Sequence, residues 1–148
     1  MDTLKFKPIY LGQCIIRYQV PLDIFTSINQ IYEQNYNSLA PANGQLVGKI
    51  EKEHSLFYHG KDQSKMKNHN FLPRNVTDYF MQVFKHYLTF NNIKEYDTHL
   101  NSIWVNEMKQ HEYNPAHVHR GMLFTGLSSV MILKLPSTYG KEYSAEHI

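Results

Sequence analysis

His117 and His119 are the residues of this chain whose type and spacing most directly suggest chemistry. In an extended segment, residues two apart point to the same side, so both imidazoles can reach one metal ion. Neutral imidazole suits iron, copper, zinc and nickel alike. The pair therefore predicts a metal site, with a surface or hydrogen-bonded pair as the alternative in a chain of nine histidines.

A specific site for a divalent metal needs a third protein ligand. In non-haem iron enzymes the facial set is two histidines and one carboxylate. Glu107, Glu112 and His111 are the nearby candidates, and with one of them the chain would be a small metallo-cupin. That alternative predicts tight metal binding without any organic cosubstrate.

The two histidines lie between segments that we expect to be strands. Residues 99–109, HLNSIWVNEMK, are expected to form a strand, because Ile103 and Val105 share one face while Trp104, Asn106 and Met108 share the other. The turn formers of residues 110–115 end this strand. Residues 127–136, LSSVMILKLP, have the continuous apolar character of a central strand.

Two amphipathic helices are predicted upstream, over residues 22–36 and 73–90, because apolar residues recur there at steps of three and four. Pro21 and Asp23 suit the start of the first helix, and Asn75 can cap the second. Lys85 and His86 belong to the wetter side of the second helix, which should end at Asn91 and Asn92. The expected core faces are Leu22, Phe25, Ile28, Tyr32 and Tyr36 in the first helix and Val76, Tyr79, Phe80, Val83, Phe84, Tyr87 and Leu88 in the second.

The remaining segments complete an α+β prediction. Residues 4–20 are typical of one strand with an irregular beginning at Pro8 and Gly12. Residues 46–60 contain His54 but lack a clear period, so a solvated loop or short strand is the preferred interpretation. We expect residues 1–148 to form a single domain in which two helices pack on an antiparallel sheet.

The composition excludes several classes of protein. The chain is 42% hydrophobic and 14% aromatic, too apolar for an intrinsically disordered protein. Its net charge is +2 and it has no long block of like charges, so no nucleic-acid partner is expected. One cysteine, no signal peptide and no long apolar run favour a cytoplasmic protein without a membrane span.

The order of the pieces around the histidines resembles the front half of the iron and 2-oxoglutarate dioxygenase fold. It is similar in particular to the small 2-oxoglutarate-Fe(II) oxygenases found in tailed phages and marine bacteria, and for a phage protein the location would be the host cytoplasm. Residues Gly48 to Phe57 also look like the segment that these proteins carry before their second helix, whereas MLFTG, residues 122–126, looks like an insertion. The other matching pieces are Trp104 to Asn106, Tyr113 to Pro115, His117 to His119, Gly121, and Leu127 to Pro136.

The resemblance implies a double-stranded β-helix, or jelly-roll, barrel and an oxidoreductase that binds Fe(II) and uses 2-oxoglutarate as a cosubstrate for hydroxylation. His117 would be the first metal ligand, and His119 stands where the family usually has a carboxylate. Trp104 and Tyr113 are the candidates for the wall of the cofactor pocket.

The family's distal His and its 2-oxoglutarate-binding Arg or Lys belong to strands beyond the matching pieces. We therefore expect the chain to be the N-terminal portion of an oxygenase domain, a fragment that is inactive or weak by itself. An incomplete sheet also gives a reason to expect a homo-oligomer. The substrate, a small molecule or a peptide, is not predicted. The main alternative is a non-enzymatic binding or structural accessory protein with surface histidines.

Overall fold

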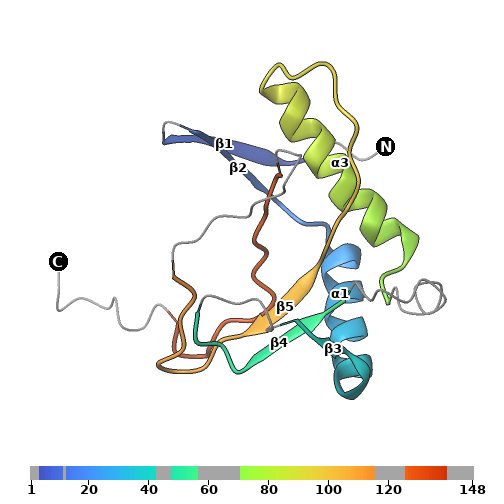
Figure 1. Cartoon of the computed structure of the whole chain (residues 1–148). Coiled ribbons are helices and arrows are strands. Elements are labelled where there is room, and N and C mark those ends of the chain that lie inside the picture. The colour runs from blue at the N-terminus through green and yellow to red at the C-terminus, as the bar shows by residue number, and fades with distance from the viewer. Residues whose placement is uncertain (1–3, 12, 43–47, 57–70, 116–125, 140–148) are drawn as a thin grey trace. The chain divides into compact units, whose positions relative to one another are not determined.

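The computed structural model describes residues 4–11, 13–42, 48–56, 71–115 and 126–139 (Figure 1). The chain divides into two units, Met1–Val118 and His119–Ile148. The described residues of the first unit form two α-helices, one 3-10 turn and two antiparallel sheets. The predicted α+β class is confirmed. In the described residues the sheets have two and three strands, so they do not form a closed barrel.

The N-terminal segment is a hairpin and not the single strand that we predicted for residues 4–20. Strand β1 (Phe6–Leu11) pairs with β2 (Gln13–Tyr18), with Phe6 opposite Tyr18. Both strands are rich in β-branched and aromatic residues, and pairing them satisfies backbone groups that one isolated strand would leave open.

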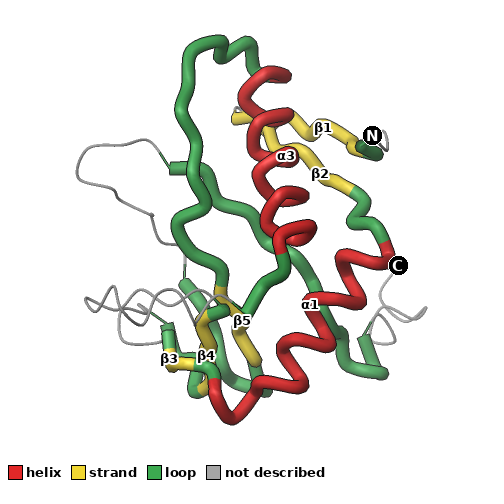
Figure 2. The backbone as a smooth tube through the Cα atoms, turned by 90° about the vertical axis from the view of Figure 1, so that its right-hand side faces the viewer, coloured by secondary structure: helices red, strands yellow, loops and turns green. Residues whose placement is uncertain are grey.

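Helix α3 (Arg74–Phe90) packs against this hairpin, as Figures 1 and 2 both show. The Tyr87 hydroxyl donates to the Cys14 carbonyl at 2.7 Å, and the rings of Phe6 and His86 lie 4.6 Å apart in an edge contact. The predicted apolar face of this helix is confirmed by the burial of its aliphatic members. His86 was expected on the wet side, but the hairpin half-buries it.

Both ends of α3 differ in detail from a side-chain-capped helix. The N-cap residue is Pro73, so the predicted cap at Asn75 is wrong because Asn75 already lies in the first turn. At the other end, Asn92 has φ 60°, and the N–H groups of Asn92 and Ile93 donate to the carbonyls of Thr89 and Leu88. This is the Schellman ending, and it confirms the predicted end of the helix at the two asparagines.

Helix α1 (Leu22–Asn35) begins after Pro21 and continues into a 3-10 turn, η1 (Tyr36–Ser38). Its buried residues are Ile24 and Ile28, while Leu22 is 78% exposed. Leu22 is the first residue of the helix and has no turn before it to bring it against the core, so its predicted place in the apolar stripe is wrong. Tyr32 and Tyr36 are half-buried.

The second sheet has the order β3-β4-β5, with β3 (Ala40–Pro41), β4 (Lys52–Ser55) and β5 (Trp104–Glu107). The short-strand interpretation of residues 46–60 is thus confirmed at β4. The strand predicted over residues 99–109 is confirmed only at β5, which is shorter than predicted. Leu56 follows β4 and is fully buried. The hydrophobic core of the described residues is Ile24, Ile28, Leu39, Ile50, Leu56, Leu72, Val76, Tyr79, Val83 and Leu88.

Residues 126–139 are the described part of the second unit, and they contain a turn at residues 137–139 but no strand. The predicted central strand at residues 127–136 is therefore wrong for this structure. A strand needs a neighbour to take up its N–H and C=O groups, and no strand in the described residues pairs with it. Its apolar side chains are accordingly exposed, Val130 by 89% and Ile132 by 59%.

No helix in the described part of the chain combines the length and the apolar character that crossing a membrane requires.

Candidate functional site

Strands β4 and β5 place polar side chains on both faces of the second sheet. In an antiparallel pair, directly opposite residues share a face. Lys52 opposite Glu107 and His54 opposite Val105 define one face. Glu53 opposite Asn106 and Ser55 opposite Trp104 define the other.

The first face holds a cluster that we call the tyrosine–glutamate cluster, made of Tyr32, Tyr36, Lys52, His54 and Glu107. The hydroxyl groups of Tyr32 and Tyr36 donate to the two carboxylate oxygens of Glu107, at 3.0 and 3.3 Å. The Lys52 ammonium donates to the Tyr36 hydroxyl at 2.6 Å. His54 Nδ1 lies 2.9 Å from the Tyr32 hydroxyl. Because the Tyr32 hydroxyl donates its hydrogen to Glu107, its oxygen accepts from His54, which requires the hydrogen-bearing form of Nδ1.

The cluster fastens α1 and η1 to the sheet. Burial and the hydrogen bond to Glu107 raise the pKa of Tyr32, and the hydrogen bond with Tyr36 raises the pKa of Lys52. Tyr32 and Lys52 therefore stay protonated at neutral pH, and each donates within the cluster. The hydrogen bonds join neighbouring members, so the arrangement is suited to holding elements together.

The opposite face carries two buried acceptor atoms without a donor, which we call the acceptor pair: Oε1 of Glu53 and Oδ1 of Asn106. Glu53 is only 3% exposed, and this burial raises the pKa of its carboxyl group. A hydrogen bond from the Trp104 side chain to Glu53 acts in the opposite direction. Trp104 itself is 37% exposed.

Two segments that carry the family resemblance meet beside this sheet. Lys49 and Tyr113 form an antiparallel bridge, with N–H···O distances of 2.9 and 3.1 Å. Gly48 lies against the same turn, where an added Cβ would overlap the Tyr113 carbonyl oxygen and come within 3.0 Å of Pro115 Cδ. The glycine is therefore needed for the close approach of the two backbones.

The predicted site residues are only partly within the described structure. Trp104 lies on β5 beside Glu53. Tyr113 is 57% exposed and is held through its main chain by Lys49. His117 and His119 lie outside the described residues.

The other candidate ligands are engaged elsewhere or exposed in a turn. Glu107 belongs to the tyrosine–glutamate cluster, and the Glu112 carboxylate accepts the backbone N–H groups of Lys109 and Glu51 at 2.7 and 3.0 Å. His111 has φ 67° and is exposed in the turn after β5. Within the described ranges no group of three His, Cys, Asp or Glu side chains can hold a metal ion. The two imidazoles of the histidine pair are donors that fit a divalent metal ion.

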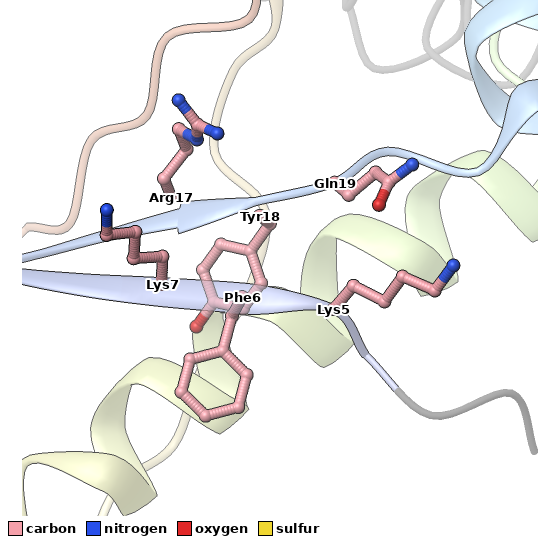
Figure 3. Close-up of a pocket in the computed structure, with 6 residues that line it drawn as sticks. All are labelled: Lys5, Phe6, Lys7, Arg17, Tyr18 and Gln19. Carbon is pink, nitrogen blue, oxygen red and sulfur yellow. The ribbon is translucent and has the colours of Figure 1, made fainter.

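A shallow pocket of about 370 Å³ lies at the open end of the β1–β2 hairpin, away from all of these residues. Figure 3 shows Phe6 and Tyr18 pointing toward α3 and Lys7 and Arg17 pointing to the other face. Burial raises the pKa of Tyr18 to about 12, and its hydroxyl lies 2.8 Å from His86 Nδ1. The pocket contains none of the residues predicted to do chemistry.

The acceptor pair and the tyrosine–glutamate cluster were both missed by the sequence reasoning. Glu53 and His54 lie in a segment whose apolar residues show no clear period. Asn106 was noted only as part of the Trp-Val-Asn piece that resembles the family. The signal that unites them is the pairing of β4 with β5, two strands far apart in the chain.

Comparison of the chain with family models, with curated proteins and with solved structures finds no match.

Proposed function

We propose that this chain belongs to a non-haem Fe(II), 2-oxoglutarate-dependent oxygenase of the jelly-roll class, acting as a hydroxylase. The observation that carries the proposal is the meeting of segments that resemble that family. Gly48 and Lys49 lie against Tyr113 immediately before the His-x-His sequence, and the Trp-Val-Asn piece is strand β5.

The donor chemistry of the histidine pair supports the same proposal. Two neutral imidazoles are a set that suits Fe(II). His117 is the first ligand of the proposed site, and His119 is the second candidate. Trp104 and Tyr113 form part of the pocket wall. When bound, iron together with 2-oxoglutarate and O2 supplies the oxidation that converts a C–H bond to a C–OH group, with succinate and CO2 as co-products.

The proposal is tested by calorimetric titration of the protein with Mn(II), a redox-inactive substitute for Fe(II), in the absence and presence of 2-oxoglutarate. We expect one saturable metal site per chain, and weak 2-oxoglutarate binding that is seen only when the metal is present, because no Arg or Lys among the matching pieces corresponds to the family's cosubstrate-binding residue. Such ordered binding follows because the cosubstrate chelates the metal.

The same titration separates the alternatives. Tight metal binding that is indifferent to 2-oxoglutarate indicates the metallo-cupin. Absence of any saturable site indicates an accessory binding or structural protein with surface histidines. Either of these two results overturns the oxygenase proposal.

A further inference from the structure

The acceptor pair is an unusual feature of the sheet because both of its unsatisfied atoms are acceptors. Oε1 of Glu53 and Oδ1 of Asn106 are buried without a donor, and the two residues lie directly opposite each other on β4 and β5. An unmade hydrogen bond to a buried polar group costs about 1–3 kcal/mol, and more for a charged group. Because the two residues lie directly opposite each other, one partner with several donors could serve both atoms.

The charge of Glu53 decides what kind of partner is suitable. A buried water molecule can donate to both oxygens, but it leaves the carboxylate uncompensated in a site of low dielectric constant. A group that is cationic and carries several N–H donors satisfies both requirements at once. Ammonium and guanidinium groups are the common groups of this type.

The two lysines that lie within β4 or just after β5 in the chain already have other partners. Lys52 precedes Glu53 but lies on the opposite face, where it donates to Tyr36. Lys109 follows β5 and forms an ion pair with Glu51. The chain itself therefore does not bring either of these cations to the acceptor pair.

Trp104 adds a second element of cation recognition. Its side chain donates to Glu53, so the indole is anchored at the buried carboxylate, while 37% of the residue remains exposed. Indole is the aromatic ring that attracts cations most strongly through its face. A carboxylate, an amide oxygen and an indole on one sheet face are together complementary to an organic cation.

We infer that the face of β4 and β5 formed by Glu53, Asn106 and Trp104 binds an organic ammonium or guanidinium group supplied by a ligand. Binding itself depends on this sheet face alone. Only the further statement that the cation belongs to the oxygenase substrate, for example a basic side chain or an amine, rests on the proposed function.

The test uses n-butylammonium and methylguanidinium as probes and n-butanol as an uncharged analogue. The chain has a single tryptophan, so its one indole N–H resonance reports directly on Trp104. We expect the two cations to shift this resonance saturably, and butanol to leave it unchanged at the same concentration. Absence of a saturable shift with either cation overturns the inference and leaves the acceptor pair to a buried water or a protonated Glu53.

Two substitutions make the test specific. Glu53→Gln keeps the size of the side chain and removes its charge, so we expect at least a tenfold loss of cation affinity. Glu33→Gln removes the same charge from an exposed position on α1 and should leave the affinity unchanged. Equal affinity in the wild-type and Glu53→Gln proteins contradicts the inference.

A second variant covers the case in which Glu53→Gln does not fold. Asn106→Ala leaves the Glu53 charge in place and removes one acceptor. It should lower the affinity for both cations, while a saturable shift of the Trp104 resonance remains. No metal is added in these experiments, so their failure leaves the oxygenase proposal standing, and failure of the Mn(II) titration leaves the cation site standing.

Discussion

At the residue scale, Gly48 is a position that tolerates no side chain. It lets the backbone of one resemblance segment approach the Tyr113–Pro115 turn that precedes the histidines. The neighbouring bridge between Lys49 and Tyr113 depends on the same approach. The Tyr113–Pro115 turn can therefore lie where it does because Gly48 has no side chain.

Gly48→Ala should therefore destabilise the protein. The new Cβ would overlap the Tyr113 carbonyl oxygen, which is backbone and can move only with the turn. We expect a loss of about 1–3 kcal/mol in the free energy of unfolding, measured in urea. Gly126→Ala is the matched control because nothing lies within 4 Å of an added Cβ there. Equal stability of the two variants would show that the close approach does not exist.

Glu112 provides a prediction on pH. Hydrogen bonds from the backbone N–H groups of Lys109 and Glu51 hold the pKa of its carboxyl group below the usual 4.5. A lowered pKa in the folded state means that this carboxylate stabilises the protein above pH 4.5 and that the contribution is lost as the pH falls through the lower, folded value.

Glu112→Gln should accordingly flatten the fall in stability on the acid side of pH 4.5. Urea unfolding at a series of pH values from neutral to acid measures this slope. Glu95→Gln, which removes an exposed carboxylate, is the control and should keep the wild-type slope. An unchanged slope in Glu112→Gln contradicts the two N–H contacts.

At the element scale, α1 is joined to the second sheet through side-chain hydrogen bonds as well as through its buried isoleucines. Tyr32 is the central member because its hydroxyl contacts both His54 and Glu107. Without it, the carboxylate loses one of its two tyrosine donors.

Tyr32→Phe should lower the free energy of unfolding by about 1–3 kcal/mol, because a half-buried carboxylate oxygen loses its donor. Tyr96→Phe removes a hydroxyl from an exposed tyrosine with long contacts of 3.3 and 3.5 Å and should change stability by less than about 0.5 kcal/mol. Thermal and urea unfolding both measure the difference. A Tyr32→Phe protein as stable as the control would mean that the cluster does not fasten α1.

The elements that could be predicted from sequence are those whose pattern is local. The helices over residues 22–36 and 73–90 follow from apolar spacing, and Asn92 marks the end of the second through its left-handed backbone. Pairing between distant strands is different. Nothing near Glu53 indicates that Asn106 lies opposite it, because the pairing depends on the whole fold.

The same argument explains the two errors in strands. The sequence predicts one strand over residues 4–20 because composition does not show where a segment turns back on itself, whereas the structure has a hairpin there. Residues 127–136 have the composition of a buried strand, but an apolar segment becomes a strand only when a neighbour accepts its backbone hydrogen bonds. In the candidate site, Trp104 was identified from the resemblance, whereas Glu53 could be found only from the register.

At the scale of the whole molecule, the exposed apolar residues of the second unit raise the question of assembly. Leu127, Val130, Ile132 and Leu135 are all exposed in the described segment. An apolar row of this kind is a surface that soluble proteins cover by association or by further strands. A homo-oligomer therefore remains a prediction of the account.

The central claim is that His117 binds iron, and its most direct test is the affinity for Mn(II), followed by the loss of the free-ion electron paramagnetic resonance signal. His117→Ala should lower this affinity by at least about 100-fold, since even indirect supports of a metal ligand contribute 10- to 100-fold. His99→Ala, an exposed histidine, should bind Mn(II) as the wild type does. If His117→Ala binds Mn(II) as tightly as His99→Ala, the metal site is elsewhere or absent, and the oxygenase account is wrong.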